Sequence, residues 1–147
     1  MYSKILVPVD GSEMAECALE HARTIATGCN VLEVILLFVA EHVSPGLYQS
    51  SEEAKEKLVT WGKDILTRTE KRLANEGVAV RSVLLEGNPS EVIIDYAAKN
   101  GVDLIIMSTH GHSGLTRLAF GSVANKVVNS SPVPVLISIP KGCRIQP

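Results

Sequence analysis

The sequence predicts an α/β protein with a single doubly wound domain, in which a five-stranded, mostly parallel sheet in the order 3-2-1-4-5 carries helices on both faces. Three observations favour this fold class. Strand and helix signals alternate from end to end of the 147-residue chain, as they do in parallel sheets with helical crossovers. Hydrophobic residues make up 46% of the chain and aromatic residues only 4%, so the core is aliphatic. The length fits one domain, which we place at residues 1–140, with a loose tail at 141–147.

The chain is predicted to begin with a strand, a helix and a second strand. Residues 4–9 form a short apolar strand that stops at a turn of Asp, Gly and Ser. Ser12 is a suitable N-cap for a helix that runs to about residue 27, and Gly28 ends it. Residues 31–39 are nearly all apolar and form a central strand.

A loop and a long helix follow. Residues 40–49 contain proline and glycine and are expected to be a loop. Ser50 and Glu53 form a capping box that begins a helix, which ends at residues 75–77. Residues 78–85 are the third strand.

The last third of the chain contains two more helices and two more strands. Asn88 as N-cap and Pro89 as first helical residue give a strong start signal for a helix that runs to residue 100. The remaining predicted elements are a strand at residues 104–107, a helix at 122–129 and a strand at 133–139.

Composition excludes several classes of function. The formal net charge is −2 and no basic block occurs, so no nucleic-acid partner is expected. Cys17, Cys29 and Cys143 are odd in number and lack C-x-x-C spacing, which argues against a disulfide framework or a zinc site and fits a reducing cytosol. The longest apolar run, residues 34–40, is too short to span a bilayer, and the N-terminus does not read as a signal peptide. We expect a soluble cytoplasmic protein with no membrane partner.

The chemistry is expected where the strands end, because ligands in open α/β sheets bind beyond the carboxyl ends of the strands. Asp10 ends the first strand and can accept hydrogen bonds from a ribose hydroxyl or an adenine amino group; the alternative is a turn residue that caps the helix. After the fourth strand, Gly111 and Gly121 are separated by nine residues and Ser122 follows. Glycines at a helix start let free N–H groups reach a phosphate; the alternative is a glycine turn with an N-cap serine.

Taken together, the motifs resemble the universal stress proteins of the adenine-nucleotide-binding kind. The resemblance covers essentially the full length in the same order. The motifs that carry it are Ile5-Leu6-Val7-Pro8-Val9-Asp10-Gly11-Ser12, Val102-Asp103-Leu104-Ile105-Ile106-Met107, Thr109-His110-Gly111-His112-Ser113-Gly114-Leu115, Gly121-Ser122-Val123-Ala124 and Ser131-Pro132-Val133-Pro134-Val135-Leu136-Ile137.

The resemblance implies a set of nucleotide contacts. The family's signature is G-x2-G-x9-G followed by Ser or Thr, and its first glycine falls on Ser108 in this chain. If that position needs a positive φ, serine would cost about 1 kcal/mol, or roughly fivefold in affinity. By resemblance, Asp10 and the Val39 backbone contact adenine or ribose. The adenine pocket is lined by Pro8, Val9 and Met107, and the phosphates are surrounded by Gly111, Gly121, Ser122, Val123 and Ala124.

The resemblance also implies ATP as the ligand, with Mg²⁺ or Mn²⁺ as a possible companion, and a regulatory stress-response homodimer. The last strand, Val133-Pro134-Val135-Leu136-Ile137, is a bare apolar edge that the family pairs with its twin. The signalling partner is unknown.

Two other functions remain open. One is a slow ATPase or an ATP-consuming transferase, although no paired carboxylates, Walker lysine or nucleophile–base set occurs and no catalytic residue is predicted. The other is a dimeric interaction protein with an empty nucleotide site.

His110 and His112 are more typical of polar loop residues than of metal ligands, and Arg117 lies where it could reach a terminal phosphate or point into solvent. Trp61 is expected to anchor the long helix to the sheet.

Overall fold

In the computed structural model, which describes residues 1–41, 52–109 and 121–139, five parallel strands form one sheet in the order β3-β2-β1-β4-β5. The strands are β1 (Lys4–Pro8), β2 (Glu33–Glu41), β3 (Val80–Gly87), β4 (Leu104–Ser108) and β5 (Val135–Ser138). The helices are α1 (Glu13–Gly28), α2 (Glu52–Asn75), α3 (Pro89–Lys99) and α4 (Ser122–Ser130). The predicted fold class and strand order are confirmed, and every strand pair of this sheet is parallel. The domain boundary at residue 140 remains a prediction.

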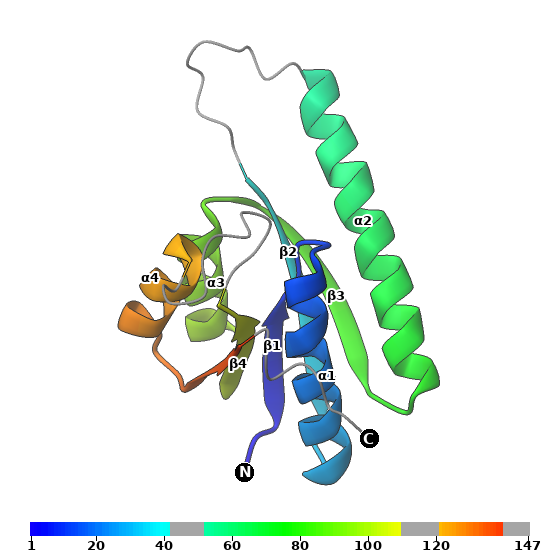
Figure 1. The fold of residues 1–147 in the computed structure, drawn as a ribbon, viewed down its shortest axis with the longest axis vertical. Helices are drawn as coiled ribbons and strands as arrows, with labels where there is room; N and C mark the ends of the chain where they lie inside the picture. The colour runs from blue at the N-terminus through cyan, green and yellow to red at the C-terminus, as the bar shows by residue number, and fades with distance from the viewer. Residues whose placement is uncertain (42–51, 110–120, 140–147) are drawn as a thin grey trace.

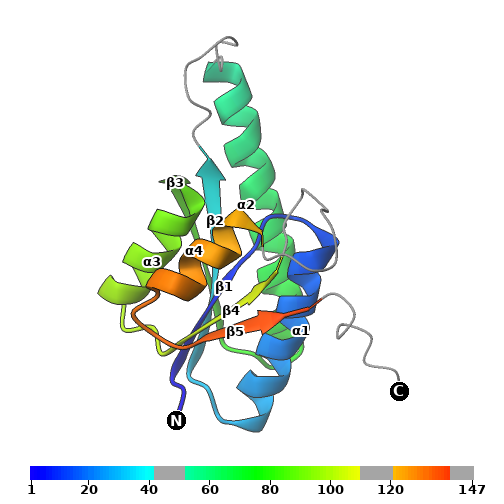
Figure 2. The same ribbon diagram turned by 60° about the vertical axis from the view of Figure 1, so that its left-hand side comes forward.

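Helices cover both faces of the sheet, as expected for a doubly wound fold. Helices α1 and α2 lie on one side and α3 and α4 on the other (Figures 1 and 2). Each face has its own apolar cluster, because alternate residues of a strand point to opposite faces. Ile5, Val34 and Ile106 belong to the cluster beneath α1 and α2, whereas their neighbours Leu6 and Ile105 belong to the cluster beneath α3 and α4.

Two predicted helix starts are confirmed by their caps. The Ser12 side chain accepts a hydrogen bond from the Ala15 N–H at 3.2 Å at the start of α1. The Asn88 side chain accepts one from the Glu91 N–H at 3.3 Å, with Pro89 as the first residue of α3. Both caps satisfy an amide that has no partner within its helix.

The predicted boundaries of β2 and β3 were wrong by two residues. At the start of β2, the Leu32 N–H and Glu33 N–H both donate to the Ser3 carbonyl, so the chain is still turning at the predicted start, residue 31. At its end, β2 continues through two residues that were assigned to the loop, because Ala40 and Glu41 remain paired with β3. Tertiary pairing, which local composition does not report, sets both ends of β2.

Helix α2 packs on the sheet from its middle to its C-terminal end, where its buried residues lie. The Trp61 ring meets the Phe38 ring of β2 edge to face, with centroids 5.7 Å apart at 85°. This confirms the predicted anchoring role, although Trp61 remains 41% exposed. The N-terminal part of α2 extends beyond the end of β2 (Figure 1). The predicted cap, Ser50, lies outside the described residues.

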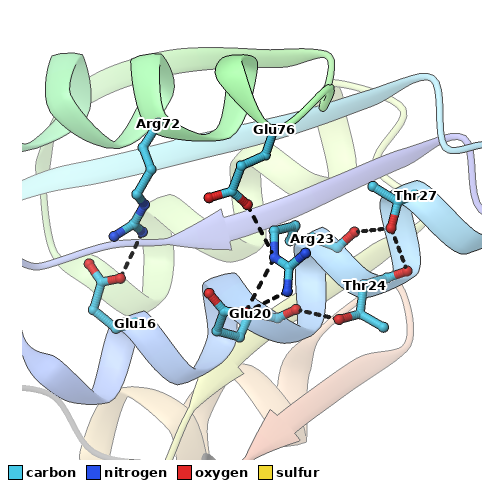
Figure 3. A network of polar contacts seen from close by, with 7 residues as sticks. All are labelled: Glu16, Glu20, Arg23, Thr24, Thr27, Arg72 and Glu76. Carbon is cyan, nitrogen blue, oxygen red and sulfur yellow. Dashed lines mark hydrogen bonds and ion pairs between the residues drawn. The ribbon is translucent and has the colours of Figure 1, made fainter. Parts of the chain in front are cut away.

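Ion pairs join the outer surfaces of α1 and α2 (Figure 3). The Arg72 guanidinium lies 2.7 Å from the Glu16 carboxylate, and the Arg23 guanidinium contacts both Glu20 at 2.9 Å and Glu76 at 3.2 Å. The two Glu20 and Glu76 carboxylates raise the pKa of Arg23 above its ordinary value, Glu20 having the larger effect. These side chains are a third to a half exposed, so the pairs contribute little to the stability of the fold.

Two further sequence-based expectations concern cysteines and membranes. Cys17, which is buried on α1, is disulfide-bonded, a bond that the number and spacing of the cysteines, which argued against a disulfide framework, did not predict. Cys29 is an exposed free thiol. Among the described helices, none combines the length and apolar character that a bilayer crossing would need. The cytoplasmic location stays a prediction.

Candidate functional site

The predicted site lies where the chain leaves β1 and β4. These two strands are neighbours in the centre of the sheet, and the chain leaves them in opposite directions. From β1 it passes through α1 to β2 on one side, and from β4 it passes through α4 to β5 on the other. Such a switch point opens a crevice at the carboxyl edge of a parallel sheet.

On the β1 side, this edge of the sheet carries a tight turn that presents Asp10. Val9 continues the strand direction, since its N–H donates to the Leu37 carbonyl at 2.9 Å. The Asp10 carboxylate accepts a hydrogen bond from the Ser12 N–H at 2.9 Å, and Gly11 between them has a φ of +79°. The structure is therefore compatible with both interpretations of Asp10, as a turn residue and as a ligand contact. Its carboxylate orders the turn before α1, and the residue is half-buried at the strand end.

The residues predicted to line the adenine pocket, and Val39, whose backbone is predicted to contact adenine or ribose, divide between the two faces of the sheet. Met107 and Val39 belong to the α3–α4 side, where Met107 is 6% exposed and Val39 is half-buried. Val9 is buried on the α1–α2 side, so it can meet a ligand at the sheet edge only through its backbone. Pro8 is half-buried at the end of β1.

On the β4 side, the strand end is tied directly to the start of α4. The Thr109 N–H donates to the Ser138 carbonyl at 3.2 Å, and the Thr109 carbonyl accepts from the Gly121 N–H at 2.7 Å. Thr109 is 6% exposed and joins β5, β4 and α4, a role that the sequence did not single out. Its one signal in the sequence is a polar residue between an apolar strand and a segment that contains glycines.

The N-terminus of α4 has the free amides that an anion site requires. Gly121, rather than Ser122, is the N-cap, and no side chain caps this helix. The first intrahelical bond runs from the Asn125 N–H to the Gly121 carbonyl at 2.9 Å. The N–H groups of the three residues between them therefore precede the helical hydrogen-bond ladder, at the positive end of the helix dipole.

The side chains of these three residues play a smaller part than their amides. Ala124 is buried and Val123 half-buried in the α3–α4 cluster, while Ser122 is exposed. An anion at this point would meet backbone N–H groups together with the Ser122 hydroxyl.

Ser108 stands at the signature's first glycine without a strained backbone. It is the last residue of β4, in register with Ser138 of β5. Within the described ranges, Asn30 is the non-glycine residue with a positive φ, and Ser108 does not share that conformation. The conformational cost considered from the sequence therefore does not arise at this position. Gly111, His110, His112 and Arg117 lie outside the described residues.

In the described parts of the chain, no group of three or more His, Cys, Asp and Glu side chains is placed to hold a metal ion.

The candidate site combines one carboxylate on the β1 side with a row of backbone donors on the β4 side. Such a pair suits a ligand with hydroxyl or amino groups at one end and negative charge at the other.

Comparisons with known proteins agree with the sequence resemblance. A family model described as the universal stress protein family matches residues 1–138. Universal stress protein MJ0577 of Methanocaldococcus jannaschii is 36% identical over 154 aligned residues, covering 93% of this chain and 94% of that protein. Its solved structure has a TM-score of 0.86 at 38% identity and covers 94% of this chain and 96% of that one.

Two other solved structures are also similar. Universal stress protein UspA from Lactobacillus plantarum has a TM-score of 0.84 at 26% identity, covering 93% of this chain and 97% of that one. The universal stress protein from Archaeoglobus fulgidus in complex with dAMP has a TM-score of 0.67 at 25% identity, covering 93% and 98%.

Proposed function

The chain belongs to the universal stress protein family, and from this premise we propose that the crevice between β1 and β4 binds an adenine nucleotide, with ATP as the ligand of a regulatory homodimer. The observation that carries the proposal is the uncapped N-terminus of α4, tied through Thr109 to the end of β4 and facing the same sheet edge as Asp10. A helix start with free amides is an anion site, and the nearby carboxylate suits a sugar or base.

Each predicted contact has a part in this proposal. Asp10 and the Val39 backbone would bind ribose or adenine, with Pro8, Val9, Met107 and Ser108 beside them. The phosphates would lie on the amides of Gly121, Ser122, Val123 and Ala124, together with Gly111. A Mg²⁺ or Mn²⁺ ion would be held through the phosphates, since the described residues contain no group of three or more candidate metal ligands. The relative from Archaeoglobus fulgidus, in complex with dAMP, supports an adenine nucleotide as the class of ligand.

Calorimetric titration of the purified protein with ATP, AMP and GTP tests the proposal. We expect ATP to bind more tightly than AMP, because α4 attracts the extra phosphates, and more tightly than GTP. Gly121→Val places a branched side chain at the N-cap and should abolish ATP binding. Ser130→Val introduces the same residue at the opposite, exposed end of α4 and should leave the affinity unchanged.

The outcomes separate the alternative functions. Bound ATP that stays intact for hours supports a regulatory binding protein, whereas steady ADP release would indicate a slow ATPase. Absence of binding at millimolar ATP would refute the proposal and leave an interaction protein with an empty site.

The homodimer is proposed to form through the free edge of β5. In the sheet of the described residues β5 is an outer strand, bonded to β4 on one side. The Pro134 and Ser138 carbonyls accept from β4, so by alternation the Val135 and Ile137 N–H groups point to the open edge. An apolar edge with free donors is a template for pairing with a second copy.

A further inference from the structure

The turn that presents Asp10 is covered from outside by helix α2. Gly11 has no side chain, and a Cβ built on it would lie 2.7 Å from Cδ1 of Ile65 and 2.8 Å from Cζ2 of Trp61. Both distances are shorter than real Cβ contacts, so these two side chains rest directly on the Gly11 backbone. The turn between β1 and α1 is thus packed against residues that follow it by about fifty positions in the sequence.

Trp61 is itself held in place by the sheet. Its ring meets the Phe38 ring edge to face at 5.7 Å, and Phe38 is 3% exposed in the core of the α1–α2 face. The backbone of Gly62 lies against the same Phe38 ring, where a Cβ would stand 2.5 Å from Cδ1 and Cε1. Contacts with the core therefore hold Trp61 in its position over the turn.

We infer that Trp61 is a positioning residue for the nucleotide, which holds the Asp10 turn in the geometry that binds the ribose and adenine end. This inference rests on the proposed function. The turn has a glycine at φ +79° and the bond from the Ser12 N–H to Asp10. Without a cover, ordering such a turn would cost conformational entropy at each binding event. Packing by Trp61 removes that cost, because the turn is already ordered before the ligand arrives.

The two ends of the site make the inference testable. Asp10 lies on the β1 side next to Gly11, on which Trp61 rests, whereas the phosphate donors lie at the start of α4, on the opposite face of the sheet from α2. Loss of Trp61 should weaken the binding of ATP but not that of a ligand that consists of phosphates alone.

The experiment is calorimetric titration of the full chain with ATP and, separately, with inorganic tripolyphosphate. Trp61→Ala should bind ATP about tenfold more weakly, which corresponds to the ordering of one backbone residue, with tripolyphosphate affinity unchanged. Trp61→Phe keeps an aromatic ring beside Phe38 but lacks the outer indole atoms Cζ2 and Cη2 that lie over Gly11, so it should recover only part of the ATP affinity. Trp61→Leu, which retains an apolar face on α2, carries the same expectation as Trp61→Ala if the alanine variant does not fold.

Leu73→Ala is the matched control. Leu73 is 2% exposed near the far end of α2, so its truncation destabilises the same helix without touching the turn. It should leave both affinities unchanged. ATP binding by Trp61→Ala that equals the wild type would overturn the inference and leave the proposed function intact. An equal loss of ATP and tripolyphosphate binding would also overturn it, since that indicates general loosening. A wild-type protein that binds no ATP would refute the proposed function, and the inference with it.

Discussion

Replacement of Gly62 by alanine should have two opposing effects on stability, a gain from helix propensity and a loss from overpacking of the core. Gly62 lies in the middle of α2, where glycine costs about 1 kcal/mol relative to alanine, so propensity alone predicts a more stable protein. In the structure, the new Cβ would lie 2.5 Å from Cδ1 and Cε1 of Phe38, about 1 Å inside the optimal separation of two carbon atoms. Phe38 is 3% exposed and contacts Trp61, so its ring has no open space to enter.

The magnitudes decide the direction of the effect. Overpacking of a core costs about 1–3 kcal/mol, and the rigid ring places this site in the upper half of that range. After subtraction of the propensity gain, we expect Gly62→Ala to lower the free energy of unfolding by about 1–2 kcal/mol. For a chain of this length, that corresponds to a melting temperature lower by roughly 2–8 °C.

Urea denaturation followed by circular dichroism and by the fluorescence of Trp61, the single tryptophan, measures this change. Gly28→Ala is the control, because Gly28 is the last residue of α1 and a Cβ there meets no atom within 4 Å. This variant should be as stable as the wild type or more stable by up to about 1 kcal/mol.

A Gly62→Ala protein at least as stable as the wild type would show that the Phe38 contact does not constrain α2, and the packing argument would fail. The double variant gives a second check. With Phe38→Leu in the background, the same Gly62→Ala change should cost less or become favourable, since the ring that opposes it is gone.

Three more predictions concern the strand ends, the helix surface and the sheet edge. The Asp103 carboxylate accepts hydrogen bonds from the Lys4 N–H at 2.9 Å and the Ser3 N–H at 2.8 Å, and these two bonds, Lys4 first, hold the pKa of Asp103 below its ordinary 3.8. Because the folded-state pKa is depressed, the stability that these bonds contribute is present above pH 3.8 and is lost as the pH falls through the folded-state pKa. Asp103→Asn should therefore be about 1 kcal/mol less stable than the wild type at pH 7. In urea denaturation, the difference in stability between the two proteins should shrink below pH 3.8. Arg72→Ala should change the free energy of unfolding by no more than about 0.5 kcal/mol at physiological salt, because both partners of its ion pair are nearly half exposed, and a loss above 2 kcal/mol would contradict this reasoning. Ile137→Pro removes an N–H that points to the open edge of β5 and should convert a dimer to monomers in light scattering. The control, Ile137→Ala, also removes the isoleucine side chain but keeps the N–H, so it should remain dimeric. If both variants are dimeric, pairing through β5 is excluded.

Local sequence patterns were sufficient for most of the architecture. The caps at Ser12 and Asn88 and the alternation of strand and helix signals give the correct elements, because these features act within a few residues. The ends of β2 were misplaced, since they depend on pairing with Ser3 at one end and with β3 at the other.

The candidate site was predictable in part. Asp10 and Gly121 mark the ends of β1 and β4, but the role of Thr109 as the link between β4, β5 and α4 depends on hydrogen bonds between distant parts of the chain. Whether Ser108 is strained also depends on its strand pairing, which the sequence does not state.

The sequence by itself determined the fold class, the order of the elements and the residue types at the strand ends, because hydrophobic periodicity, caps and glycines act over short distances. The tertiary structure alone decided what covers the Asp10 turn. Trp61 and Ile65 reach Gly11 only because α2 packs on β2 and β3 on the same face of the sheet as the turn, and Gly62 is required there because Phe38 occupies the space of a side chain. Contacts of this kind join distant parts of the chain, and they follow from close packing in three dimensions rather than from any local pattern.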